Sequence, residues 1–110
     1  PPASGVKGAA IADQGEIVQA RRDLKSEVAK IDAKITERKR LLDSVKEKKI
    51  GVTLSVQPLK TADGRSLDSL RMAVSSLSSV ADAAAVKSGL SQIERILDAD
   101  LALFHRLGRI

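Results

Sequence analysis

Apolar residues in the first half of the chain recur at alternating intervals of three and four positions. Between residues 9 and 49 there is no proline, and Gly15 is the only glycine. This alternation is the heptad pattern of a coiled-coil helix, whose apolar seam faces a partner helix. We therefore predict a helix over residues 12–49. Its predicted seam consists of Ile17, Leu24, Val28, Ile31, Ile35, Leu42 and Val45.

Two positions of this seam are polar, because Arg21 and Arg38 fall within the same heptad pattern. A buried polar residue in a coiled-coil seam often selects the register or the partner instead of adding stability. We expect these two arginines to act in that way.

A short segment after this helix alternates apolar and small residues from Ile50 to Val56. A period of two indicates an extended or β segment, here over residues 50–59. Pro58 cannot donate a hydrogen bond within a sheet, so it ends a strand or lies at an edge. Residues 61–64 then predict a turn. The segment is either an ordered extended linker or a strand that pairs with its copy in another chain.

The second half of the chain shows two apolar stripes that are offset from each other. Ser66 is a suitable N-cap for a helical region over residues 66–107. The offset lies beside Gly89, and glycine is both unfavourable in helix interiors and common after helix ends. We predict a kinked helix, or two helices that meet near Gly89. The predicted seam here comprises Leu70, Val74, Leu77, Leu90, Ile93, Leu97 and Phe104.

The order of these elements predicts an all-α fold. Two helical arms of similar length, with a short segment between them, favour a long antiparallel helical hairpin or coiled coil. A three-helix bundle with one long helix is the alternative if Gly89 divides the second arm. Residues 1–8, rich in proline, glycine and serine, predict a flexible lead-in to a single helical domain over residues 9–110.

Composition favours a narrow seam between helices over a thick globular core. The chain has one phenylalanine and neither tyrosine nor tryptophan, although large aromatic side chains anchor most compact cores. Between residues 69 and 86 the only charged residues are Arg71 and Asp82. A helix that is neutral nearly all round is typically contacted on more than one side. The predicted inter-subunit surface contains Ala73, Ser76, Ser79, Val80 and Ala83, with Val52, Leu54 and Val56 of the extended segment.

The residues that usually carry catalysis or bind metals are few. The chain has no cysteine and a single histidine, His105, which excludes thiolate sites and a two-histidine site within one chain. Glu94, Asp98 and His105 share one helix face, but a solvated polar face explains them better than a metal site between subunits. No phosphate-binding loop or nucleophile motif is present. We predict no enzyme activity and no cofactor.

Most of the net positive charge lies in the first half of the chain. The net charge is +5, and residues 1–49 hold 12 basic and 8 acidic residues. Basic clusters at residues 21–22, 38–40 and 46–49 could bind nucleic acid or an anionic surface. Acidic residues alternate with them at spacings that allow local ion pairs, and no aromatic residue is available for base stacking. A solvated coiled-coil face is therefore favoured over nucleic-acid binding.

These patterns predict a structural or scaffolding coiled-coil subunit that forms a homo-oligomer or bridges protein partners in a larger assembly. No apolar run is long enough to span a membrane. The layout of two helical arms with a strand segment between them is similar to that of prefoldin subunits. That similarity, which is one of layout alone, implies a holdase-type chaperone as the second candidate function. An anionic-surface or nucleic-acid binder is the third.

Overall fold

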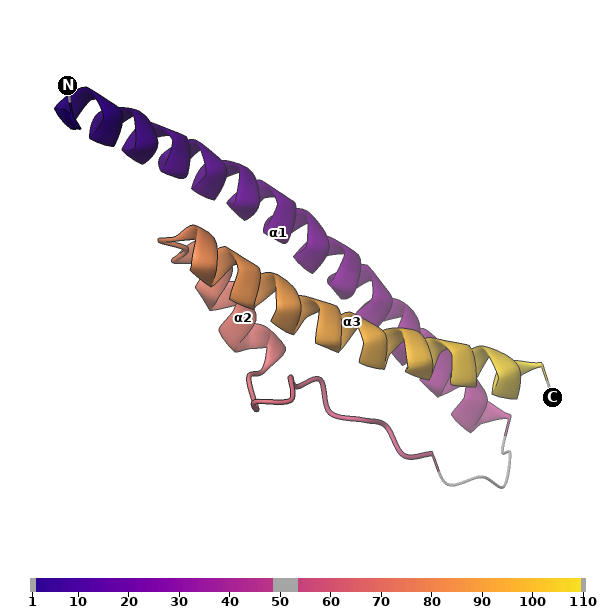
Figure 1. Ribbon diagram of the computed structural model, residues 1–110. Helices are drawn as coiled ribbons and strands as arrows, with labels where there is room; N and C mark the ends of the chain where they lie inside the picture. Colours follow the sequence, from indigo (N-terminus) through magenta and orange to yellow (C-terminus); the bar gives the residue numbers. More distant parts are fainter. Residues whose placement is uncertain (1, 49–53, 110) are drawn as a thin grey trace.

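Three helices form the part of the protein that the computed structural model describes, which covers residues 2–48 and 54–109 and gives side chains from Gly15 onward. They are α1 (Pro2–Glu47), α2 (Leu67–Ser75) and α3 (Val80–Gly108). Together they make a rod that measures 72 × 22 × 18 Å. Helices α1 and α3 pack along each other (Figure 1). The prediction of an all-α fold with two long, closely packed helices is confirmed.

Helices α1 and α3 run in the same direction. Lys34 of α1 contacts Asp98 of α3, and Lys48, just after α1, donates to the carbonyl of Gly108 at the end of α3. From the first contact to the second, the residue number rises on both helices. Both helices therefore run toward the same end of the rod (Figure 1). The predicted antiparallel orientation of the two long arms is therefore corrected to parallel. The antiparallel helical pair is α2 with α3, joined by a short turn.

The extended segment between α1 and α2 explains this direction. Leu54 packs beside Phe104, near the C-terminal end of α3, while the backbone N–H of Ala62 donates to Gln92 at 2.7 Å. The segment therefore returns the chain toward the start of the rod. An extended chain covers about 3.3 Å per residue and a helix about 1.5 Å, so a dozen extended residues match roughly 26 helical ones. An antiparallel hairpin needs this segment only to turn at its tip, whereas the extended segment is long enough to return along the rod.

The return segment is extended but forms no strand in residues 54–66. One isolated antiparallel bridge joins Lys60 and Ser66 across the predicted turn, where Gly64 adopts a φ of 88°. Leu54 is half-buried against the bundle and Val56 is exposed. Val52, the third residue of the predicted strand, lies outside the described residues. The interpretation as an ordered extended linker fits the described part of this segment.

The second arm is divided, but not at Gly89. Helix α2 ends at Ser75, and the Ser79 side chain caps α3 by accepting a hydrogen bond from the Asp82 N–H at 3.1 Å. Gly89 lies inside the continuous helix α3 and is buried. A Cβ atom there would lie 2.9 Å from Cδ2 of Leu70. A larger residue at this position would require Leu70 to shift, because α2 packs closely on α3. The predicted break is corrected to residues 76–79.

Gly89→Val is expected to destabilise the bundle by about 1–3 kcal/mol, because the larger side chain would overpack the α2–α3 contact at Leu70. Helix propensity alone would predict the opposite sign, since glycine is the poorer helix former. Urea unfolding followed by circular dichroism measures the change. Ser88→Val, at the exposed neighbouring position, is the matched control and should shift the unfolding midpoint little. Equal midpoints for the two variants would contradict the close packing.

Helix α1 begins at Pro2 and so extends over residues 2–8, for which the sequence predicts a flexible lead-in. Proline is well accepted in the first turn of a helix because the N–H group that it lacks has no partner there. After Pro2, no further proline occurs before Pro58. The start of α1 is therefore compatible with the composition that suggested a lead-in.

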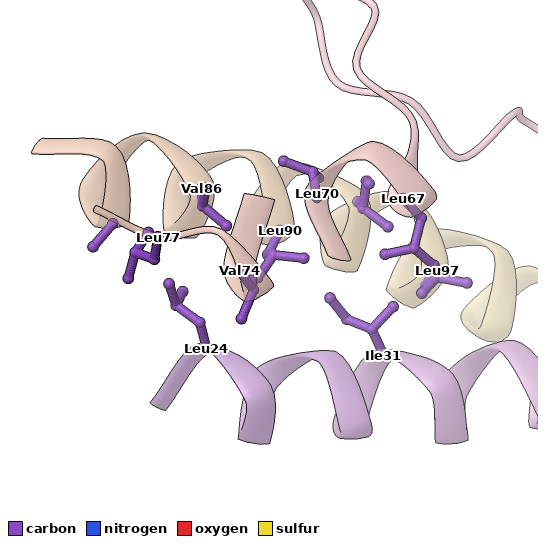
Figure 2. Packing of buried hydrophobic residues seen from close by; sticks show 11 residues of the cluster. Leu24, Ile31, Leu67, Leu70, Val74, Leu77, Val86, Leu90 and Leu97 are labelled. Atoms are coloured by element: carbon purple, nitrogen blue, oxygen red, sulfur yellow. The ribbon is translucent and has the colours of Figure 1, made fainter. Parts of the chain in front are cut away.

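The core consists of two apolar clusters between the helices. The larger one joins all three helices, and Figure 2 shows Leu24 and Ile31 of α1 pointing toward side chains of α2 and α3. The smaller one gathers Leu41 and Val45 around Phe104. Ten residues of the predicted seams are buried in these clusters: Leu24, Ile31, Val45, Leu70, Val74, Leu77, Leu90, Ile93, Leu97 and Phe104. The other four pack against them half-buried: Ile17, Val28, Ile35 and Leu42.

Candidate protein-interaction surface

Helix α1 extends beyond the rest of the bundle at the end where α3 begins. Arg21 donates to the carbonyl of Leu77 at 3.0 Å, so this level of α1 faces the turn between α2 and α3. Ile17 and Ala20 pack against the larger core cluster. Figure 1 shows α1 continuing past this turn toward its N-terminus. We call residues 2–16 of α1 the arm; they span about 22 Å as a helix.

A groove of about 540 Å³ lies between α1 and α3 next to the arm. Its floor includes Leu24 and Ala83, which are both buried in the core. Along each helix the lining residues are spaced at intervals of three and four, so each helix contributes one stripe of its surface. This α1/α3 groove is lined by Ala20, Asp23, Leu24, Ser26, Glu27, Lys30, Val80, Ala83, Ala84 and Lys87.

Small side chains and exposed apolar residues mark this end of the bundle. The groove walls carry Ala20, Ser26 and Ala84, which leave room for another backbone to approach closely. Val18 of α1 and Val80 of α3 are exposed over 46% and 45% of their surface. Singly exposed apolar residues are common on proteins, but Val80 lines a groove that continues the core.

The residues of the predicted inter-subunit surface do not form one surface in the structure. Ala83 is buried and Ala73 packs against the core, so both serve contacts within the chain. Ser79 caps α3, while Ser76 lies exposed in the turn. Only Val80 and Ala83 of this set line the α1/α3 groove. The small, neutral character of residues 69–86 is largely explained by the turn and by the packing of α2 on α3.

A buried ion pair links α1 to α3 and to the return segment. Nη2 of Arg38 lies 2.8 Å from Oδ2 of Asp100, and their side chains are only 11% and 6% exposed. Arg38 also donates to the carbonyl of Gln57 at 2.7 Å. The contact with Arg38 is an ion pair, and its geometry does not make Oδ2 of Asp100 the acceptor of a hydrogen bond. The seam arginine thus has two partners, and one of them, Asp100, was not identified from the sequence.

The acidic residues considered as a metal patch are engaged elsewhere. Lys34 lies 2.8 Å from Asp98 and 3.4 Å from Glu94. The hydrogen bond to Asp98, with the negative charges of both carboxylates, raises the pKa of Lys34. Among the described residues, no group of three or more metal-ligating side chains lies close enough together to hold an ion. Ion pairs such as Arg40 with Glu37 at 2.5 Å also occupy part of the basic surface of α1.

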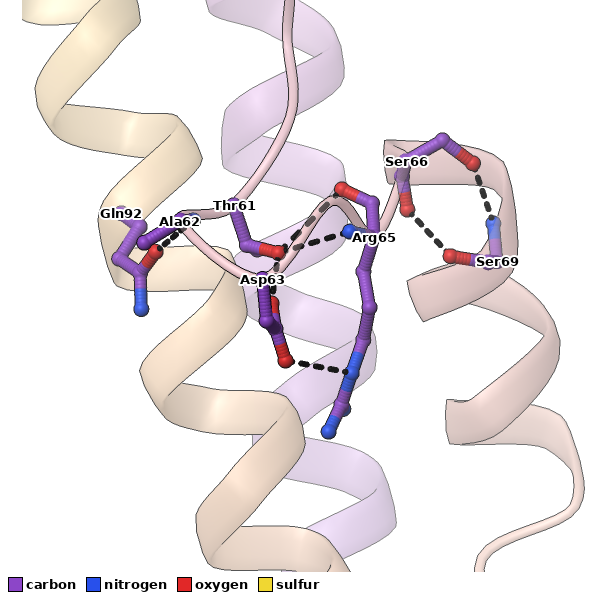
Figure 3. A network of polar contacts seen from close by, with 7 residues as sticks. All are labelled: Thr61, Ala62, Asp63, Arg65, Ser66, Ser69 and Gln92. Carbon is purple, nitrogen blue, oxygen red and sulfur yellow. Dashed lines mark hydrogen bonds and ion pairs between the residues drawn. The ribbon is translucent and has the colours of Figure 1, made fainter.

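A polar network holds the return segment where it enters α2 (Figure 3). The Thr61 hydroxyl donates to Asp63 and accepts from the backbone N–H of Arg65 at 2.9 Å. Its bond to Asp63 lowers the pKa of that carboxyl. The Ser66 hydroxyl accepts from the N–H of Ser69 and so caps α2. Each of these hydrogen bonds completes a turn or a helix end, so the network has a structural role.

In comparisons with protein-family models, with curated proteins and with solved structures, no match to this chain is found. No helix in the described part of the chain has the length and apolar character needed to cross a membrane.

Proposed function

We propose that this protein is a structural subunit that joins protein chains in a larger assembly through the end of the bundle where α1 projects. The observation that carries the proposal is the length of α1, a helix of 46 residues beside an α3 of 29. The two helices are level at their C-terminal ends, so the excess length lies at the N-terminal end of α1. A helix that leaves its bundle offers a surface to a partner chain.

The adjoining groove supports the same proposal. It continues the apolar core to the surface, at the level where the arm begins. Apolar surface of this kind is covered in most stable assemblies by a partner with a complementary shape. Neither the holdase-type chaperone nor the anionic-surface binder is favoured by a specific observation among the described residues.

The protein is expected to self-associate in solution, with a mass that is a multiple of the 11.7 kDa chain. Light scattering on a sizing column, repeated from low micromolar to near-millimolar concentration, measures this mass. Concentration should be read by refractive index because the chain has no tryptophan or tyrosine. Met72→Glu, at an exposed site on α2, should leave the mass unchanged and serves as the control. A constant mass of one chain over the whole range would contradict a self-assembling subunit.

A further inference from the structure

The seam between α1 and α3 repeats at heptad spacing on both helices. One heptad before the Arg38–Asp100 pair, the two helices carry Ile31 and Ile93, which have no exposed surface. The same spacing leads to one more apolar pair before these residues and one after the ion pair. We call these pairs of positions layers: Leu24 with Val86, Ile31 with Ile93, Arg38 with Asp100, and Val45 with Leu107.

The aliphatic layers alone do not determine how the two helices align. Leucine, isoleucine and valine differ by at most one methylene group, and exchanges among them are well tolerated in protein cores. Outside the layer of Arg38 and Asp100, a shift of α1 by one heptad would again place aliphatic residues opposite each other, as in Ile31 with Val86. Such a shift moves α1 by about 10 Å along the rod.

The return segment leaves room for such a shift. Leu54 packs at the level of Phe104, and Ala62 is bonded to Gln92, which lies twelve residues earlier on α3. Twelve helical residues span about 18 Å, whereas the eight residues from Leu54 to Ala62 can span about 26 Å when they are fully extended. The segment therefore has slack and does not by itself fix the alignment of α1.

The charged layer is the layer of this row that penalises a shift. If α1 moved by one heptad toward its N-terminus, Arg38 would lie opposite Ile93 and Val45 would lie opposite Asp100. Both charges would then be buried without a counter-charge, which is strongly destabilising. Even in the native pair, Nε of Arg38 and Oδ2 of Asp100 are buried without a hydrogen bond. The pair is thus better suited to exclude other alignments than to add stability.

We propose that Arg38 and Asp100 set the register of α1 against α3, and with it the length of α1 that projects from the bundle. The arm is about 22 Å long, so a shift of one heptad would change its reach by about half. Arg38 also donates to the carbonyl of Gln57 at 2.7 Å, so the same side chain fastens the return segment in this register. This inference goes beyond the proposed function, because it concerns two helices of one chain and holds whether or not chains associate.

Nitroxide labels on Ala29→Cys in α1 and Ala102→Cys in α3 report the register, because both positions are exposed and the chain has no other cysteine. With Arg38 level with Asp100, position 29 is level with position 91, about 16 Å along the rod from position 102. A shift of α1 by one heptad toward its N-terminus lengthens this separation to about 27 Å. An excess of unlabelled chain restricts the measured distances to pairs within one chain.

Arg38→Val with Val45→Arg moves the arginine by one heptad along α1. We expect α1 to follow it, so that position 45 lies beside Asp100 and the distance between the labels lengthens by about 10 Å. Lys39→Val with Lys46→Arg is the matched control, because it makes similar changes at exposed positions one residue further along α1. The control should keep the native distance. A native distance in both variants would overturn the proposal.

Arg38→Met with Asp100→Leu removes the charged layer, and it keeps the proposal testable if the moved arginine prevents folding. We expect this variant to stay helical by circular dichroism and to show a second distance, longer or shorter by about 10 Å, in at least a tenth of the chains. Lys34→Met with Asp98→Leu removes a surface ion pair instead and should keep one distance. A single native distance in the variant without the buried pair would mean that packing alone sets the register, and the proposal would be wrong.

Discussion

Ile31→Asp is expected to unfold the bundle. Ile31 has no exposed surface and lies in the larger core cluster, where side chains of all three helices meet. A carboxylate placed there finds no partner, and burial of an unpaired charge or its protonation costs several kcal/mol. A domain of this size is stable by only about 5–15 kcal/mol in total. We expect a loss of more than about 4 kcal/mol, measured by urea unfolding and by the helical signal at 222 nm.

Ala33→Asp is the matched control for this prediction. It introduces the same residue two positions further along α1, at an exposed site. The unfolding midpoint should change by only a few tenths of a kcal/mol, which is typical of surface substitutions. If Ile31→Asp were as well folded as Ala33→Asp, the seam of α1 would not face the core as described.

Asp100→Ala is expected to be the second most damaging change, at about 3–5 kcal/mol, because it leaves the buried guanidinium of Arg38 without its counter-charge. The carbonyl of Gln57 would remain as a partner, but a neutral acceptor compensates the charge only in part. Chemical unfolding of the two proteins measures the difference. A loss near zero would contradict the burial of the pair.

Two further variants separate the buried pair from an exposed one. Asp98→Ala removes a surface partner of Lys34, and pairs of that kind contribute about 0–1 kcal/mol. Replacing both buried partners, as in Arg38→Met with Asp100→Leu, should recover most of the stability lost by Asp100→Ala. A double variant as unstable as the single one would show that the loss arises from packing and not from the unpaired charge.

The seam of α1 was predictable because helical periodicity survives in the sequence. Ile31 and Val45 repeat at heptad spacing, and both are buried. Asp100 was not predictable from the same pattern. An aspartate beside the apolar residues of a helix resembles a surface residue until its partner, here Arg38 on a distant part of the chain, is known. Leu41 is also buried although it falls outside the strict heptad.

The direction of the long helices could not be read from the seam. A heptad pattern places apolar residues on one face but is equally compatible with a parallel and an antiparallel partner. The direction is set by the return segment, which packs from Leu54, beside the Phe104 cluster, back to Ala62 at Gln92, against the direction of α3. Gly89 was misleading for a similar reason, because glycine breaks helices and also permits close packing.

The candidate surface was only partly predictable. Val80 and Ala83 were identified as interface residues from their small, neutral surroundings, and both line the groove. The α1 wall of that groove, including Ala20 and Asp23, was not identified. A groove between two helices depends on which faces they present to each other, and that required the parallel arrangement of α1 and α3.

The distance between positions 34 and 98 tests that arrangement most directly, because the arm and the groove both depend on it. Nitroxide labels on Lys34→Cys and Asp98→Cys can be placed specifically, since the chain has no cysteine of its own. Parallel helices place the two positions side by side, about 10–20 Å apart with the labels included. An antiparallel hairpin would separate them by about 25 Å along the rod before the labels are counted. A short distance supports the parallel bundle, and a distance near 30 Å or more would contradict it.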